Sequence, residues 1–326
     1  MADWAELVYT VLEVLIAVAC CLGNLLVIWA VWTCGATRRQ PTFCFVVSLA
    51  VADFLVGAVG VPMAVLVDGR FRISFYSCVV LCSLLIVLTQ ASVLSLLAIA
   101  LDLFLRVHIP LRYQTLVTRQ RSWWVVVVCW ITAYLLSSTS LLSWTQQPAN
   151  SSNSSNSSNS SAEPICEFVN VIPIPYMVYF NFPCCILFPL LCTSVLYTCI
   201  FQRIRKQLYI RDAMSRGYYQ KERHLAKPLL LVQVLFMVCW LPIHLINVAL
   251  LVKAKVPQGV VYVGILLSHA NSAVNPVVYS FKMPRIQKAY RQIWRRYVLG
   301  SGKQEPSSST LDNTYSKMLS SKDTNL

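Results

Sequence analysis

Polar side chains in the last long apolar stretch of the chain are spaced so that they share one face of a helix. Within Gly264–Phe281 (GILLSHANSAVNPVVYSF) they recur at Ser268, Ser272, Asn275 and Tyr279, at steps of four, three and four residues. Unpaired polar groups in hydrocarbon cost several kcal/mol each. We therefore expect this face to turn towards other helices or a wet cavity.

A proline directly follows Asn275 in this stretch. Pro276 removes one backbone hydrogen bond, so the helix can bend there if neighbours or water satisfy the freed carbonyl. The pattern predicts a moving part that the rest of the chain encloses.

A carboxylate lies in the second apolar stretch, at Asp53 within LAVADFLVG. A charge at that depth needs a partner or an ion. Two interpretations stay open: a structural hydrogen bond to a neighbouring helix, or a cation site. Other polar residues in apolar surroundings are Asn24, Thr89, Gln90, Ser92, Asn181 and Tyr197.

The stretch FMVCWLPIHLIN combines aromatic and polar residues around a proline. Trp240 and His244 are four residues apart about Pro242, and Asn247 lies one turn further. This spacing predicts an aromatic and polar face that points into a helix bundle at a bend.

Catalysis is not expected from this chain. It has no nucleophile and base pair, no phosphate-binding loop and no metal-spaced His/Cys cluster, and its four histidines are scattered. It also has no internal repeat or paired half-helices of the kind that transporters use. We expect neither an enzyme nor a transporter, and no resident cofactor.

The composition indicates the elements that hold these residues. The chain has 326 residues, of which 57% are hydrophobic and 12% charged, and its mean hydropathy is +0.60, which is typical of a membrane protein. Seven runs are long enough to cross a bilayer: Val8–Trp32, Phe43–Val67, Cys78–Leu101, Trp123–Trp144, Pro175–Ile200, Leu229–Val252 and Val260–Phe281.

Positive charge is unevenly distributed over the connections. Lys and Arg gather after the first, third, fifth and seventh runs, within a net charge of +14. The positive-inside rule then places the N-terminus outside the cell and the C-terminus in the cytosol. Because these charges alternate with membrane spans, we do not expect nucleic-acid binding. The acidic N-terminus has no cleavable signal pattern, so the first span is expected to direct insertion.

The connection before the fifth span carries features of an extracellular loop. Cys78 and Cys166 are the cysteines on the oxidising side that are placed to pair, and such a bridge would hold the loop over the bundle with Phe168 aimed inward. That ring would be either a plug or a stacking surface. Four N-x-S sites predict glycosylation, although an unmodified polar spacer stays open: Asn150, Asn153, Asn156 and Asn159.

The sequence predicts an all-α membrane protein: a bundle of seven transmembrane helices followed by an amphipathic eighth helix on the inner leaflet. Residues 1–7 form the extracellular N-terminus and 8–281 the bundle of seven spans. Residues 282–297 form the amphipathic helix, in which Ile286, Tyr290, Ile293 and Trp294 face six basic residues. Residues 298–326 form a Ser/Thr-rich, disordered cytoplasmic tail that kinases could phosphorylate.

These motifs together resemble the rhodopsin-like family of G-protein-coupled receptors over nearly the whole chain. The matching residues are Gly23-Asn24, the LAVAD segment that ends at Asp53, Trp130, the CWLP segment that ends at Pro242, and the NPVVY segment that ends at Tyr279. Within that family, LRVHIPLRY, YMVYFNF, WLPIHLIN and VPQGVVYVGILLSHANSAVNP are similar to an adenosine receptor. The Phe168-Val169 pair and VPQ with GILLSHANS are most similar to subtype three.

The resemblance implies a nucleoside site. Asn247 would hold the adenine, since its amide donates and accepts at once, and Phe168 would stack on the purine. Ser268 and His269 would bond the ribose hydroxyls. Plain packing stays open for every residue of this site, including its further members: Thr89, Gln90, Asn181, His244, Trp240, Met177, Ile243, Ile246, Ile265 and Leu85.

The resemblance also implies an allosteric sodium site. Asp53, Ser92, Asn271 and Ser272 would supply the oxygen atoms, with Trp240 beside them, and the ion would favour the inactive packing.

Three departures from the family pattern matter for signalling. Asp102-Leu103-Phe104 stands where the family has Asp-Arg-Tyr, so Asp102 and Glu222 lose their usual arginine partner. Arg106, one turn away, could replace part of that charge. Pro228 could break or bend the helix that must swing outward. Val169 replaces a glutamate that other subtypes use.

We expect a plasma-membrane receptor that binds adenosine, couples to an inhibitory G protein and lowers cyclic AMP, with arrestin and receptor kinases acting on the tail. Asn275, Pro276, Tyr279 and Tyr197 would belong to its switch. The alternative is a receptor that binds ligand but signals atypically or not at all, as a decoy or heterodimer partner, because of Leu103.

Overall fold

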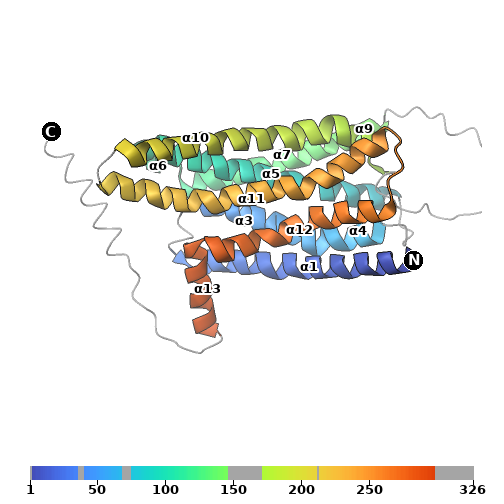
Figure 1. Ribbon diagram of the computed structural model, residues 1–326, viewed down its shortest axis with the longest axis horizontal. Helices are drawn as coiled ribbons and strands as arrows, with labels where there is room; N and C mark the ends of the chain where they lie inside the picture. The colour runs from blue at the N-terminus through green and yellow to red at the C-terminus, as the bar shows by residue number, and fades with distance from the viewer. Residues whose placement is uncertain (1, 36–39, 68–74, 146–170, 211–212, 298–326) are drawn as a thin grey trace, which may run out of the picture. The chain divides into compact units, whose positions relative to one another are not determined.

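The computed structural model describes residues 2–35, 40–67, 75–145, 171–210 and 213–297. Every regular element in these ranges is a helix (Figure 1). The predicted glycosylation sites, Cys166 and Phe168 lie outside the described residues.

Seven of the helical segments are long and apolar enough to cross a membrane, which confirms the seven predicted spans. The first is α1 (Ala2–Thr33), and the third and fourth are α5 (Phe75–His108) and α7 (Arg119–Thr145). The sixth and seventh are α11 (Ala213–Leu251) and α12 (Gln258–Lys282). The remaining two are composite: α3 (Thr42–Leu55) with η1 (Val56–Gly60) and α4 (Val61–Val67), and α9 (Ile174–Tyr176) with η2 (Met177–Leu187) and α10 (Phe188–Ile210).

The helices pack in a closed order. α1 contacts α3 and α12, α5 contacts α3, α7, α10 and α11, and α11 lies between α10 and α12. α5 is therefore the central helix, and residues on it can reach several neighbours.

Several helix boundaries lie beyond the apolar runs. α10 continues to Ile210 and α11 begins at Ala213, so most of the basic connector between the fifth and sixth apolar runs (residues 201–228) belongs to these two helices. α11 runs without interruption through Pro228 and Pro242. Pro228 therefore does not break the helix. The short helix α6 (Pro110–Leu116) follows α5 and was not expected.

The π-helical segments η1 and η2 were also not expected. η2 contains Pro183, which has no N–H to donate to the usual carbonyl, and a wider turn accommodates this gap. Asn181 and Met177 lie on this segment, so the irregular turns set where both side chains point.

Polar contacts join neighbouring helices inside the bundle. Trp130 Nε1 donates to Ser48 Oγ at 3.0 Å, and Ser48 Oγ lies 3.0 Å from Ser95 Oγ, which links α7, α3 and α5. Asn24 Nδ2 donates to the Ser272 carbonyl at 3.0 Å and so links α1 to α12. A Cβ on Gly23 would lie only 3.0 Å from Pro276, which shows how closely these two helices approach.

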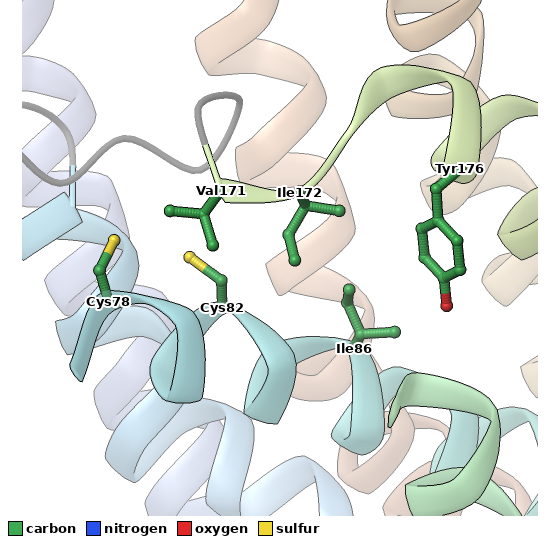
Figure 2. Packing of buried hydrophobic residues seen from close by; sticks show 6 residues of the cluster. All are labelled: Cys78, Cys82, Ile86, Val171, Ile172 and Tyr176. Carbon is green, nitrogen blue, oxygen red and sulfur yellow. The ribbon is translucent and has the colours of Figure 1, made fainter. Parts of the chain in front are cut away.

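A buried cluster fixes the segment that leads into α9. Cys78, Cys82 and Ile86 on α5 pack against Val171, Ile172 and Tyr176 (Figure 2). Cys78 is disulfide-bonded. The start of the fifth span is thereby held against α5.

The chain divides into two units, Met1–Ala289 and Tyr290–Leu326. α13 (Pro284–Tyr297) contains the boundary, and its last residues are the described part of the second unit. α13 covers the predicted range from Pro284 onwards, while Lys282 ends α12, and the role of α13 as the amphipathic eighth helix stays a prediction. Its place on the inner leaflet stays a prediction.

Candidate functional site

An aromatic row runs along α11 and faces the fifth span. The ring centroid of Trp240 lies 5.7 Å from that of Phe236 and 6.0 Å from that of His244. The ring centroid of His244 lies 4.3 Å from that of Phe182 on η2. His244 is only 3% exposed, yet neither of its ring nitrogens has a hydrogen-bond partner, and Trp240 Nε1 has none either. Buried polar atoms of this kind are costly unless something binds them.

A buried amide pair joins α5 to η2. Gln90 Nε2 donates to Asn181 Oδ1 at 3.1 Å, and Gln90 Oε1 has no partner. One residue earlier, Thr89 Oγ1 donates to the Leu85 carbonyl at 3.0 Å. The hydroxyl of Thr89 is thus oriented by its own helix and keeps its oxygen available to accept.

Glu13 is a site residue that the sequence interpretation missed. It is fully buried on α1, and its carboxylate oxygens lie 2.9 and 3.0 Å from His269 Nδ1 on α12. An acid inside the first apolar run is the same signal that identified Asp53. Glu13 positions the His269 ring, while Ser268 Oγ donates to the Ile265 carbonyl at 2.7 Å.

The other expected ligand residues divide into two groups. Asn247 lies three residues beyond His244 on α11 and is partly exposed, as are Ile243 and Ile265. Ile246 instead packs at the contact between α11 and α12, since a Cβ on Gly264 would lie 2.6 Å from its Cδ1. Leu85 packs towards Gly60 in η1, and Met177 packs on the cluster of Figure 2. These last three residues make packing contacts, and their place in the ligand site stays a prediction.

The carboxylate of Asp53 is fully buried among donors from two other helices. Asn275 Nδ2 donates to it at 2.7 Å and Ser92 Oγ at 3.5 Å, and Ser272 also bonds to it. The side-chain oxygens of Asn271 and Asn275 have no hydrogen-bond partner. The described residues contain no group of three or more His, Cys, Asp or Glu that could hold a metal. A cation here would depend on one carboxylate and neutral oxygens.

The third group of expected residues lies at the Asp102 end of α5. Leu103 is fully buried, and Arg106 forms ion pairs with Asp102 at 3.4 Å and with Glu222 at 3.8 Å. Asp102 and Glu222 therefore share a cationic partner, Arg106. Because position 103 carries leucine and not arginine, the sequence led us to expect only part of this charge to be replaced. Tyr197 and Tyr279 are buried on α10 and α12.

The described residues form a bundle of seven helices with three groups of buried polar residues, around His244, Asp53 and Asp102. This is the architecture of a membrane receptor. The family model described as "7 transmembrane receptor (rhodopsin family)" matches residues 23–279. This match covers most of the chain and all seven spans, the first of them from Gly23 onwards.

Known proteins narrow the class further. The chain is 39% identical over 300 residues to adenosine receptor A3 of Ovis aries, covering 91% of this chain and 92% of the relative. It is 37% identical over 309 residues to adenosine receptor A3 of Canis lupus familiaris, with 94% and 96% covered. Adenosine receptor A2a of Homo sapiens is 38% identical over 310 residues, with 92% and 74% covered.

The chain belongs to the adenosine receptor family of rhodopsin-like receptors. It is a multi-pass membrane protein and not an enzyme. Its identities to A3 and A2a relatives are nearly equal, so they do not separate the subtypes.

The Glu13–His269 contact predicts an unequal effect of two substitutions. His269→Ala leaves a fully buried carboxylate without its partner and should cost about 3 kcal/mol of folding free energy or more. Glu13→Gln keeps a hydrogen bond and should cost about 1 kcal/mol. Thermal unfolding of the purified receptor in detergent measures both, with Val14→Ala, on the exposed face of α1, as the control. Equal stability of the two variants would contradict the assigned contact.

Proposed function

We propose that this chain is a receptor for extracellular adenosine. The observation that carries the proposal is a set of unpartnered buried polar atoms, on His244 and Trp240, one and two turns from Asn247 on α11, and on Gln90 of α5. A nucleoside offers ring nitrogens, an amine and hydroxyls that would satisfy such atoms. The relatives named adenosine receptors support the same ligand.

The proposed binding mode assigns a role to each part of the site. Asn247 bonds the adenine edge, because its amide both donates and accepts. Phe168, outside the described residues, stacks on the purine. His269, oriented by Glu13, and Ser268 bond the ribose hydroxyls. Trp240 forms the floor, and its place beside Pro242 couples ligand contact to the bend of α11.

Asn247→Ala removes the group that recognises the base. We expect specific adenosine binding to fall at least about a hundredfold, since the amine and ring nitrogen of the adenine would be buried without hydrogen-bond partners. Radioligand binding on membranes measures this, with surface expression followed in parallel. Val248→Ala, on the next residue and half-exposed, is the matched control. Affinity that survives in Asn247→Ala would remove the adenine contact from the proposal.

We also propose that Asp53 binds sodium. Its carboxylate, Ser92, Ser272 and the unpartnered Asn271 oxygen are hard oxygen ligands of the type that alkali and alkaline-earth cations take. When bound, the ion supplies positive charge beside Asp53. Asn275 holds the other carboxylate oxygen and so connects the site to Pro276.

Asp53→Asn removes the charge that would hold the ion while keeping the side-chain shape. Agonist affinity of the unsubstituted receptor should fall as sodium replaces potassium at constant ionic strength, and this dependence should vanish in the variant. Competition binding measures both. If sodium still changes agonist affinity in Asp53→Asn, the ion binds elsewhere.

The proposed output is inhibition of cyclic AMP synthesis through an inhibitory G protein. Basic residues after the odd-numbered spans support an extracellular N-terminus and a cytoplasmic C-terminus. In this orientation the four N-x-S sites face the glycosylation machinery, and the Ser/Thr-rich tail faces receptor kinases and arrestin. The ligand would act by shifting the population of α11 conformations.

One observation favours a second candidate, a receptor that binds ligand without conventional signalling. Position 103 carries a fully buried leucine, which cannot contact a G protein with a positive charge.

The double variant Leu103→Arg, Phe104→Tyr separates the two candidates. If the native chain signals conventionally, it should lower cyclic AMP on adenosine addition, and the variant should change the response less than about tenfold. If the variant responds and the native chain is silent at equal ligand affinity, the second candidate is correct. A cyclic AMP assay beside radioligand binding gives both readings.

A further inference from the structure

Arg106 contacts side chains of two other helices, α3 and α6, and Asp102 of its own helix α5. Its Nη2 donates to Thr42 Oγ1 on α3 and, at 3.0 Å, to the Tyr113 hydroxyl on α6. Those two hydroxyls in turn donate to different oxygens of Asp102. The Tyr113 hydroxyl donates to Oδ1 at 2.6 Å, and Thr42 Oγ1 donates to Oδ2. Each hydroxyl therefore bridges the guanidinium and the carboxylate, using its donor and an acceptor site at once.

The hydroxyl of Tyr113 is the donor that joins α6 to Asp102. Burial raises the pKa of the Tyr113 hydroxyl, so it stays protonated and can donate to Asp102. The guanidinium also lies over the Tyr113 ring, with 5.0 Å from Cζ to the ring centroid. The Asp102 side of Arg106 is thus anchored by charge, hydrogen bonds and ring contact.

The contact of Arg106 with α11 is of a different kind. Its Nε lies 3.8 Å from Glu222 Oε2, which is an ion pair without a hydrogen bond, and neither atom has any hydrogen-bond partner. Tyr218 on the same helix donates to the Arg106 carbonyl at 2.9 Å. The link to α11 is therefore the weaker side of the network and the side that would separate first.

A buried glutamine limits which part of α11 can move. Gln233 is fully buried, and its Nε2 donates to the Leu190 carbonyl at 3.2 Å and to Ser194 Oγ at 3.0 Å on α10. Between Gln233 and Glu222 lies Pro228, which supplies no backbone donor and leaves the helix one hydrogen bond short. α11 is thus hydrogen-bonded to α10 at Gln233 and contacts Arg106 at Glu222, and Pro228 lies between these two positions.

We propose that residues 213–227 of α11 form a gate, which Arg106 latches shut through Glu222 and Tyr218, and which swings about Pro228 while Gln233 keeps the rest of α11 on α10. Arg106 thereby takes over, one helical turn further along α5, the closing contact that position 103 no longer provides. The proposal rests on the proposed function only in that agonist would favour the open gate.

Other charges near Glu222 bear on the design of a test. Lys221 and Arg285 also act electrostatically on Glu222, so removing its charge would disturb more than the Arg106 contact. Substitutions of Arg106 are therefore the sharper probe. Arg106→Lys keeps one positive charge but lacks the planar fork that serves both hydroxyls.

The test is single-molecule energy transfer in the full-length, unliganded receptor in nanodiscs. Fluorophores are attached through noncanonical residues at Gln114 on α6 and His224 on the gate, both exposed, so that the native cysteines stay in place. Arg106→Ala should raise the low-transfer population at least about fivefold, the lower range of conformational coupling. Arg106→Lys should give a smaller rise, and Arg112→Ala, an exposed arginine of α6, none.

A second label pair locates the hinge. In this pair the second fluorophore is attached at Val238, on the far side of Gln233, and no longer at His224. Arg106→Ala should then leave the transfer efficiency unchanged. An unchanged distribution at the gate pair in both Arg106→Ala and Arg106→Lys would overturn the latch. A change at both pairs would overturn the hinge at Pro228. If Arg106→Ala fails to fold, Arg106→Lys carries the same comparison. No agonist or G protein is present, so a failed adenosine proposal would leave this outcome unaffected.

Discussion

Hydrocarbon offers a polar side chain no partner, and this constraint accounts for the inner organisation of the receptor. A buried polar group is stabilised by a partner on another helix, and three such pairs are Glu13 with His269, Gln90 with Asn181, and Asp53 with Asn275. They hold α1 to α12, α5 to η2, and α3 to α12. Several of these residues, among them His269, Gln90 and Asp53, also belong to the expected ligand and sodium sites, so the same side chains serve helix packing and the proposed recognition.

The proposed nucleoside contacts, the proposed sodium site and the contacts of Arg106 are connected through α11 and α12. α12 carries His269, Asn271, Ser272 and Asn275 in succession, so it links the proposed nucleoside contacts to the proposed sodium site. α11 begins with the segment that Arg106 contacts and carries Trp240, His244 and Asn247 further along. Ligand contact and gate are therefore parts of the same helix, with Pro242 and Pro228 between them.

Most of the fold was predictable, since apolar length and charge bias identify spans one at a time. The inward residues of α11 and α12 followed from helical spacing. Other features depend on neighbours that a single sequence does not reveal. The packing of Ile246 against Gly264 and the two bridging hydroxyls of Thr42 and Tyr113 are examples. Glu13 was visible in the sequence by the rule that identified Asp53, whereas the π-helical turns had no clear signal.

The central claim is that this chain binds adenosine and transmits that binding to an inhibitory G protein. The most direct test measures cyclic AMP and radioligand binding together, in cells expressing the unsubstituted chain with and without adenosine. The account predicts saturable, nucleoside-competed binding and a fall in stimulated cyclic AMP over the same concentration range. Absence of specific nucleoside binding at normal surface expression would contradict the ligand. Binding with unchanged cyclic AMP would contradict the output and favour a receptor that binds without signalling.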